Sequence, residues 1–292
     1  KIDDLSYKLE SPFTSIRIFG TDKLYEIAKK KGVKVIIEGH GGDEMLAGYK
    51  YNHFPYLLDQ SKIRSLKMIN RIENISEKVS KNELQKKNNI LTLYHQGLST
   101  TDGTPFFEKN VFRHSFLKIN LKKFSNHELS KEIAKIGFVK SSQLFDIKKI
   151  KLPRILRYSD RLSMNYGIEC RVPLLNHKLF KFCFDLDNND KFYKGETRYL
   201  FKKIYHKDMR KLLTKQKKSI VDPQTYWLKN ELVDFVYDNF NSNIVKNSEI
   251  FNQKNLIKYY ESFLKGNIRN SFQIFSILST ISFLKVFKEF KF

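Results

Sequence analysis

The sequence contains few groups that could form a disulfide or bind a transition metal. Of its 292 residues only Cys170 and Cys183 are cysteines, and their spacing matches neither a disulfide framework nor a metal-binding motif. The seven histidines also lack the paired spacing of zinc ligands. Because such cysteine usage is typical of a reducing compartment, we expect a cytoplasmic protein.

Long hydrophobic runs are also missing. The longest apolar stretch, residues 272–284, contains Ser and Thr and is followed by Lys285. A membrane-spanning helix needs about 20 apolar residues, so we expect no membrane partner and predict a buried C-terminal helix here. The hydrophobic content of 41% and the 25 phenylalanines nevertheless supply a core and exclude wholesale disorder.

Acidic residues are scarce relative to basic ones. Lys and Arg number 54 against 31 Asp and Glu, which gives a formal net charge of +23. Such a surplus is typical of proteins that bind polyanions. The basic residues are scattered, however, and form no stripe interleaved with aromatic residues. We therefore predict no nucleic-acid partner, and a basic polyanion-binding protein is the last of the alternatives.

The first residue is Lys1 rather than an initiator Met, and the sequence shows one convincing strand of the buried parallel type, residues 33–37. Its β-branched run is typical of a strand covered on both faces. A single strand cannot make a sheet. We therefore expect the C-terminal part of a longer protein with an α/β fold.

The most informative segment follows that strand and joins it to a predicted helix. The turn contains three glycines, Gly39, Gly41 and Gly42. In an open α/β sheet, ligands bind beyond the carboxyl ends of the strands, and glycine lets the backbone approach them closely. Asp43 and Glu44 therefore emerge where phosphates and Mg2+ would lie. A plain turn with a capping Asp is the alternative, but it needs fewer glycines and acids.

A second dense block spans residues 152–176. It predicts a helix that carries Arg157, Asp160 and Arg161, and a tight exit at Arg171 to Pro173. Polar side chains among apolar ones need mutual pairing, because a lone buried charge is expensive. Two interpretations remain open, an internal ion-pair network of Asp160 with the arginines and direct substrate contact, and the residues could do both.

Most of the remaining chain is predicted to be helical. We expect a helix over residues 19–31, ended by Gly32. Residues 45–98 and 106–150 are also expected to be largely helical. A further helix is expected to begin near Thr197.

Taken in order, these segments resemble the synthetase domain of glutamine-dependent asparagine synthetases, over nearly the whole chain. Residues 39–49 resemble the family's Gly-x-Gly-x-Asp-Glu turn with its trailing Gly-Tyr, and residues 152–173 resemble its second signature. Residues 195–200 match a third signature. A weaker fourth comprises Lys217, Pro223 and Trp227-Leu228. Four signatures in the family's order are a far more specific signal than any one of them.

The resemblance implies a fold and a division of the chain. The fold would be a partial parallel sheet of the adenine-nucleotide alpha-hydrolase (ATP-pyrophosphatase) type with a large helical part. Residues 1–292 would form one synthetase domain, incomplete at its N-terminal side. Within it, residues 1–52 would be the remaining nucleotide-binding α/β part, and residues 53–292 the helical part that carries the substrate-side motifs.

The same resemblance identifies two absent features. Neither the family's pyrophosphate-binding Ser-Gly-Gly-x-Asp-Ser loop nor its glutaminase domain with an N-terminal Cys nucleophile is found in this sequence. We therefore expect the chain alone to bind ATP poorly, not to hydrolyse glutamine and to be inactive. We also expect it to expose a sheet edge and apolar surface.

The chemistry implied by the resemblance is amide formation with ATP and Mg2+. An aspartate-like carboxylate attacks the α-phosphorus of ATP, which gives an acyl-adenylate and pyrophosphate, and ammonia from a glutaminase domain then displaces AMP. The residues implied to lie beside the nucleotide are Glu38, Gly39, Gly41, Asp43 and Glu44. Asp43 is also implied to be a ligand of Mg2+. The implied substrate-binding or structural network comprises Asp160, Arg161, Arg171 and Lys217. A homodimer of the full-length protein remains open.

Two departures from the family pattern affect the implied catalytic residues. His40 stands where many members have Glu, and it could still move a proton near neutral pH. Arg198 stands where Lys is usual, and it keeps the charge and can grip phosphate but cannot give up a proton. Lys215 and Ser219 also replace the usual Arg and Gly. The alternatives are therefore a relative that amidates or cyclises another carboxylate (a sugar acid, a peptide or a β-amino acid), and a catalytically silent module.

Overall fold

The computed structural model describes seven parts of the chain, and everything below concerns these parts: residues 1–49, 52–60, 115–118, 135–193, 196–205, 223–267 and 271–287. Several residues and ranges named above lie outside them: 61–98, 106–114 and 119–134, Gly195, Lys215, Lys217 and Ser219.

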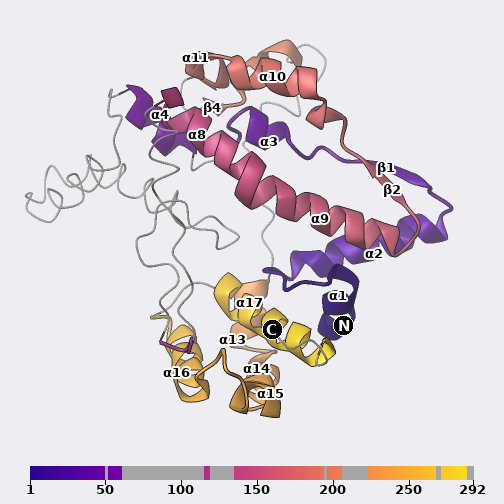
Figure 1. Cartoon of the computed structure of the whole chain (residues 1–292), viewed down its shortest axis with the longest axis vertical. Coiled ribbons are helices and arrows are strands. Elements are labelled where there is room, and N and C mark those ends of the chain that lie inside the picture. The colour runs from indigo at the N-terminus through magenta and orange to yellow at the C-terminus, as the bar shows by residue number, and fades with distance from the viewer. Residues whose placement is uncertain are drawn as a thin grey trace, which may run out of the picture.

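The described parts are mostly helical, with short strands (Figure 1). The elements before the second signature are α1 (Ile2–Leu9), α2 (Arg17–Lys30), β1 (Val35–Ile37), α3 (Gly42–Met45), α4 (His53–Gln60), α8 (Phe138–Phe145) and the π-helix η2 (Asp146–Ile150). The elements of the middle part are α9 (Lys151–Met164), β2 (Glu169–Arg171), the 3-10 helix η3 (Pro173–Leu175), α10 (His177–Asp185), α11 (Asn188–Lys191), β3 (Phe192–Tyr193) and β4 (Glu196–Thr197). The C-terminal helices are α13 (Gln224–Lys229), α14 (Val233–Phe240), α15 (Asn243–Lys246), α16 (Gln253–Leu264) and α17 (Ser271–Val286).

Several predicted helices are confirmed, and one boundary is wrong. The helix expected over 19–31 corresponds to α2, and the helix expected within the block 152–176 corresponds to α9. The helix expected from Thr197 instead begins at residue 199, because Thr197 lies in β4 and pairs with Phe192. The antiparallel ladder thus takes up the residues that the sequence assigned to a first helical turn.

A small parallel sheet forms between β1 and β2, which are far apart in the sequence. Val35 pairs with Glu169, and Ile37 pairs with Arg171. The amide of Glu38 continues the ladder with a 2.8 Å hydrogen bond to the carbonyl of Arg171. The sequence analysis identified only the first of these strands and missed β2, whose last residue, Arg171, it assigned to the exit at Arg171 to Pro173. The reason is that β2 carries charged residues at both ends and has no β-branched run to reveal it.

The prediction that β1 is buried on both faces was also wrong for the described parts. Ile37 is 73% exposed and Val35 is 38% exposed, whereas Ile36 packs against the main core. Among the described strands, β1 pairs only with β2, so one face and one edge have no described cover. These side chains are apolar surface of the kind that the sequence analysis expected.

The main core joins the N-terminal helices to the C-terminal ones. Residues of α1, α2 and α9 share one hydrophobic cluster with α13, α14, α16 and α17. Helix α17 is buried through Ile274, Leu278 and Ile281, each at most 1% exposed, so the predicted buried C-terminal helix is confirmed. Two serines of α17 bind the N-terminal segment, because Ser279 accepts from the amide of Phe13 at 2.7 Å and Ser282 accepts from Ser6 at 3.0 Å. None of the described helices is long and apolar enough to cross a membrane.

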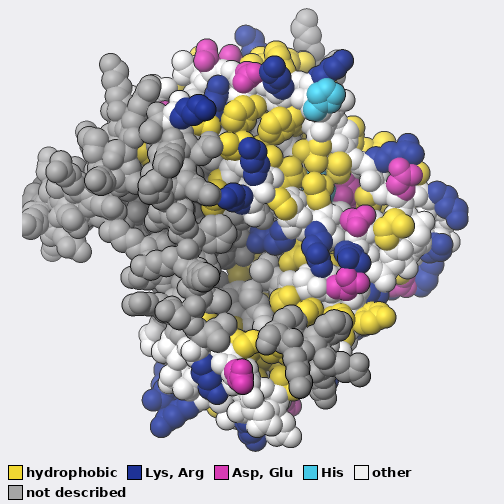
Figure 2. Space-filling view, viewed as in Figure 1, with side chains coloured by type: hydrophobic (Ala, Val, Ile, Leu, Met, Phe, Trp, Pro, Cys, Tyr) yellow, Lys and Arg dark blue, Asp and Glu magenta, His cyan; other side chains and the backbone are white. Residues whose placement is uncertain are grey.

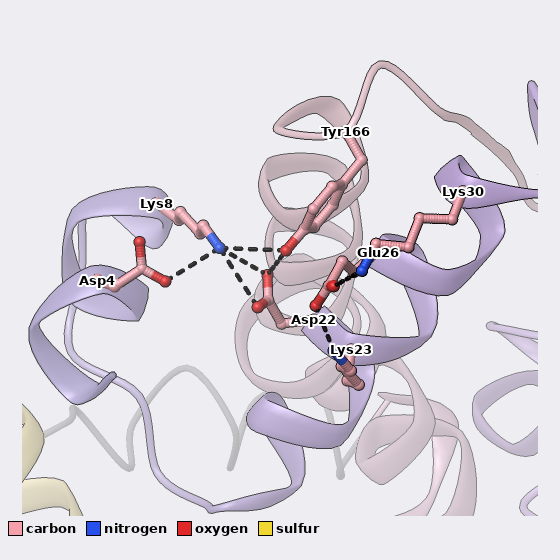
Figure 3. A network of polar contacts seen from close by, with 7 residues as sticks. All are labelled: Asp4, Lys8, Asp22, Lys23, Glu26, Lys30 and Tyr166. Carbon is pink, nitrogen blue, oxygen red and sulfur yellow. Dashed lines mark hydrogen bonds and ion pairs between the residues drawn. The ribbon is translucent and has the colours of Figure 1, made fainter.

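A polar network fastens α1 and α2 to the turn after α9 (Figure 3). The ammonium of Lys8 lies 3.2 Å from a carboxylate oxygen of Asp22 and donates to the hydroxyl of Tyr166 at 3.2 Å. Tyr166 in turn donates to Asp22 at 3.0 Å. Burial alone would lower the pKa of Lys8, but its hydrogen bonds to Asp4, Tyr166 and Asp22 outweigh burial and raise it. The network therefore fixes α1, α2 and the turn after α9 relative to one another. Helix α2 leads into β1 and this turn leads into β2, so the network supports the β1–β2 sheet.

The helices α10 and α11 lie on the opposite side of α9 from the C-terminal helices in Figure 1. Two smaller clusters lie around the end of α3. Met45 and Leu46 pack with Cys183 of α10, and Ala47 packs with Val139 of α8 and Phe192 of β3. On the face shown in Figure 2, Lys and Arg side chains are interspersed with acidic and apolar ones and form no single stripe. This part of the surface agrees with the scattered basic pattern of the sequence.

Candidate functional site

The glycine-rich turn leaves the carboxyl end of β1 and enters α3 at Gly41. Gly41 has a φ of 94°, in the left-handed region that L side chains rarely adopt. A Cβ at this position would also lie 2.2 Å from a methyl carbon of Leu175. The backbone conformation therefore favours glycine here, and a side chain would also displace Leu175.

Glu38 is the first residue of this turn, and its side chain is held on both sides. The hydroxyl of Tyr25, on α2, donates to one carboxylate oxygen at 2.6 Å, and Nε2 of His40 lies 3.0 Å from the other. The interaction with His40, opposed by burial and supported by Tyr25, lowers the pKa of Glu38 to about 2. The sequence analysis assigned only the backbone of Glu38 to a nucleotide, and missed this side-chain contact. A charged residue directly after an apolar strand was the available signal.

His40 is anchored through a single ring nitrogen. Its Nε2 atom lies 3.0 Å from Glu38 and 3.1 Å from the hydroxyl oxygen of Ser159 on α9. A Ser-His-acid relay requires the serine and the acid on different ring nitrogens, so this arrangement does not activate Ser159 as a nucleophile. The side chain of His40 remains 27% exposed. The ring is therefore partly accessible while Glu38 holds it, and its catalytic role stays a prediction.

Asp43 and Arg198 come from distant parts of the sequence and form an ion pair. A guanidinium nitrogen of Arg198 lies 3.2 Å from Oδ1 of Asp43. The Nε atom of Arg198 is buried and has no hydrogen-bond acceptor among the described residues. Arg198 also has a φ of 57°, which costs a non-glycine residue roughly 1–2 kcal/mol. Such strain clusters at functional sites, so the structure brings two of the predicted residues together in a strained setting.

Gly48 lies directly against this ion pair. A Cβ at Gly48 would be 2.0 Å from Oδ1 of Asp43 and 3.0 Å from Cδ of Arg198. Its amide donates to the carbonyl of Asp43 at 2.7 Å, and its carbonyl accepts from the hydroxyl of Thr197 at 3.3 Å. Gly48 therefore joins α3 to β4 at the point where Asp43 and Arg198 meet. The sequence analysis noted the trailing Gly-Tyr pair but gave Gly48 no role.

Comparison with known proteins decides the family. The family model described as "Asparagine synthase" matches residues 1–286. The chain belongs to the asparagine synthase family. A curated relative, asparagine synthetase [glutamine-hydrolyzing] 1 of Bacillus subtilis (strain 168), is 25% identical over 276 residues, which cover 87% of this chain and 41% of the relative. The chain thus spans less than half of that relative's length. The family membership inferred from the four signatures is confirmed.

Two other residues of the family turn have different settings. Gly39 has open space where a Cβ would lie. Glu44 is only 5% exposed, and its carboxylate accepts from the hydroxyl of Tyr49 at 2.5 Å. Burial, then the nearby Glu44, raises the pKa of Tyr49, and the ammonium of Lys151 lies 3.8 Å from the centre of its ring. Glu44 is therefore a buried residue of α3, and its contact with a nucleotide stays a prediction.

The predicted ion-pair network of Asp160 with the arginines of the second signature does not form among the described residues. Asp160 is exposed on α9, Arg161 pairs with Glu10 at 2.8 Å, and Arg171 pairs with Glu169 at 2.9 Å. The network was expected because these residues were taken to be buried. Their exposure removes the need for mutual pairing, and it leaves substrate contact as the untested interpretation.

The described residues supply only part of a metal site. No three His, Cys, Asp or Glu side chains in the described ranges lie close enough together to hold a metal ion. Mg2+ in phosphate-binding sites commonly uses one or two carboxylates, with water and phosphate oxygens as its other ligands. The side chain of Asp43 is 25% exposed, so it fits the role of one such carboxylate. Its assignment as a magnesium ligand therefore stays a prediction.

Proposed function

We propose that this chain is the synthetase part of an ATP-dependent amide ligase that forms AMP and pyrophosphate. It would adenylate a carboxylate, aspartate or a similar one, and transfer ammonia to the activated carbonyl. The family membership supports the class of reaction. The main structural support for this site is the ion pair of Asp43 and Arg198, which lies beyond the carboxyl end of β1. The buried Nε–H of Arg198 has no acceptor among the described residues and could bind a phosphate oxygen. We also propose that the β1–β2 sheet is part of an ATP-pyrophosphatase-type fold.

Arg198 and Asp43 have complementary tasks in this proposal. Arg198 holds negative charge on the phosphates, because its Nε–H is a preformed donor in a partly buried site. Asp43 would supply one carboxylate to Mg2+. When bound, Mg2+ would neutralise charge on the phosphate oxygens. Phosphoryl and adenylyl transfers depend mainly on such positioning and charge stabilisation.

His40 handles a proton in this proposal, and Glu38 holds it in place. The family's more usual residue at position 40 is an acid, and in this chain an acid lies two residues earlier and contacts the imidazole. Glu38 therefore restrains the ring through Nε2. The rest of the ring remains accessible to a proton from the attacking ammonia.

The proposal includes partners and a location. The ammonia would come from glutamine through a glutaminase domain, and the chain alone would be inactive. The full-length protein could form a homodimer. A reducing cytoplasm suits the two free thiols, Cys170 and Cys183.

The test is pyrophosphate release by the protein in its full natural length, with ATP, Mg2+ and a panel of carboxylates headed by aspartate. We expect release with one of them, and Asp43→Asn should lower it by about 100-fold or more. Asp22→Asn is the control, because Asp22 is an ion-paired carboxylate of the α1–α2 network outside the site. Unchanged release in Asp43→Asn would overturn the metal assignment.

The panel also separates the alternatives. Release with a sugar acid, a peptide or a β-amino acid, and none with aspartate, would identify a relative with another acceptor. No AMP with any carboxylate would favour the catalytically silent module.

A further inference from the structure

Lys191 is a fully buried cation that the proposed chemistry does not use. It ends α11 with 0% exposure. Its ammonium donates to Oε1 of Gln143 at 3.0 Å and to the carbonyl of Phe184 at 3.0 Å. Burial of a charge is expensive even when it is hydrogen-bonded. Burial accordingly lowers the pKa of Lys191 to about 8. A residue with this cost requires an explanation other than packing.

Gln143 connects Lys191 to the turn that carries Asp43. This residue of α8 is 1% exposed, and its amide nitrogen donates to the carbonyls of Glu44 at 2.9 Å and Met45 at 2.5 Å. Both carbonyls lie at the C-terminal end of α3, a helix of four residues. The last carbonyls of a helix have no partner within it, and here Gln143 supplies one to both.

Lys191 and the two carbonyls of α3 favour the same orientation of the Gln143 amide. An ammonium can only donate, so it must face the amide oxygen, and the two N–H bonds then face α3. The turned amide would present its oxygen to the carbonyls of Glu44 and Met45, which would repel it, and its N–H groups to the ammonium, which cannot accept. The buried charge therefore reinforces the orientation that the two carbonyls already favour.

A second contact from α8 supports the same segment. The amide of Asn52 donates to the hydroxyl of Ser142, and its oxygen accepts from the backbone N–H of Tyr49 at 3.1 Å. Neighbouring residues of α8 thus hold both ends of residues 44–52. The start of α8 is itself fixed, because Asp59 accepts from the amides of Phe138 and Val139 at 2.7 and 3.0 Å.

We propose that Lys191 and Gln143 form a positioning pair that fixes the backbone of α3 and thereby the Asp43 carboxylate beside Arg198. The assignment of the site rests on the proposed function, but the restraint on α3 does not. Neither residue touches the reacting groups, so both are positioning residues.

The experiment compares four variants of the protein in its full natural length: Gln143→Met, Lys191→Met, the double variant, and Gln224→Met as the matched control. Gln224 is 0% exposed on α13, accepts from the amide of Ile16 at 2.9 Å and donates to Ser271 at 3.3 Å. It is therefore a buried glutamine that also binds backbone, through its oxygen rather than its nitrogen, and it lies on the other side of α9 from α3 in Figure 1. Each protein is measured for its thermal midpoint, for amide hydrogen exchange over residues 43–49, and for kcat and KM of pyrophosphate release.

We expect Gln143→Met and Gln224→Met to lower the midpoint by similar amounts, but only Gln143→Met to speed exchange over residues 43–49. The kcat of Gln143→Met should fall about 10- to 100-fold, as for a misplaced catalytic group, with a smaller change in KM. The double variant should recover much of the midpoint, because an apolar pair replaces a polar one, and yet retain fast exchange and a low kcat.

Recovery of kcat together with stability in the double variant would overturn the proposal, since the pair would then be structural only. Unchanged exchange over residues 43–49 in Gln143→Met would overturn it too. If the parent protein releases no pyrophosphate at all, the proposed function fails, and the exchange measurement still decides whether the pair restrains α3.

Discussion

Gly48 leaves no room for a side chain beside Asp43, because its Cβ would lie 2.0 Å from the carboxylate oxygen Oδ1. We predict that Gly48→Ala displaces this carboxylate and lowers kcat for pyrophosphate release by about tenfold or more, with a smaller effect on the thermal midpoint. Gly20→Ala is the control, since a Cβ at Gly20 in α2 meets nothing within 4 Å. That variant should be as active as the parent and more stable by about 0.5–1 kcal/mol. Full activity in Gly48→Ala would show that Asp43 tolerates displacement.

The ion pair of Glu38 with His40 predicts a loss of stability in acid. The pKa of Glu38 is lowered to about 2, so its contribution is present above the usual carboxyl pKa of about 4.3 and is lost as the pH falls toward 2. Urea unfolding should therefore show a smaller stability loss between pH 6 and pH 3 in Glu38→Gln than in the parent. Glu169→Gln is the control, because Glu169 pairs with Arg171 on the exposed surface and should change little. Identical pH profiles for Glu38→Gln and the parent would contradict the pairing.

Arg198 provides a test of positive charge against the bidentate shape of the guanidinium. If Arg198 acts by holding charge on a phosphate, Arg198→Lys should retain pyrophosphate release within about tenfold, and Arg198→Met should lose about 100-fold or more. Steady-state kinetics at several ATP concentrations would separate kcat from KM. Equal losses in the two variants would indicate that the bidentate shape of the guanidinium, rather than its charge, is required.

The network in Figure 3 predicts a purely structural effect. Asp22→Asn should lower the free energy of unfolding by about 1–3 kcal/mol, because it removes the charged acceptor of Lys8 and Tyr166 in a partly buried site. Activity per folded molecule should not change. Asp4→Asn is the comparison, because the side chain of Asp4 is 57% exposed, and its ion pair with Lys8 is expected to contribute less than about 1 kcal/mol. Denaturant unfolding with parallel activity assays measures both quantities.

The sequence predicted the parts of the fold that have a strong local signal. Helices α2 and α9 and the buried helix α17 follow from apolar spacing and from the residues that end them. Strand β2 was missed because only Cys170 in it is apolar, and a parallel strand is defined by its partner rather than by its own residues. The β4 strand was read as helix for the same reason, since its pairing with Phe192 and Tyr193 is not visible locally.

In the candidate site, too, the sequence identified residues that belong to a motif and missed contacts between distant parts of the chain. The signatures identified Asp43 and Arg198, and the structure brings them to 3.2 Å. The contacts of Ser159 with His40 and of Gln143 with α3 could not be predicted, because they join residues far apart in the sequence that have no motif of their own. The expected partners of Asp160 were wrong because the sequence does not reveal which face of α9 is exposed.

The pairing of β1 with β2 has a consequence for how the site is assembled during folding. The amide of Glu38, at the entrance of the glycine turn, is bound to the carbonyl of Arg171. The turn therefore cannot reach its final geometry until the chain has closed a loop that contains more than a hundred residues. Long-range closure of this kind is slow relative to helix formation. We expect α2 and α9 to form first, and the binding groups at the carboxyl end of β1 to become ordered in one of the last folding events.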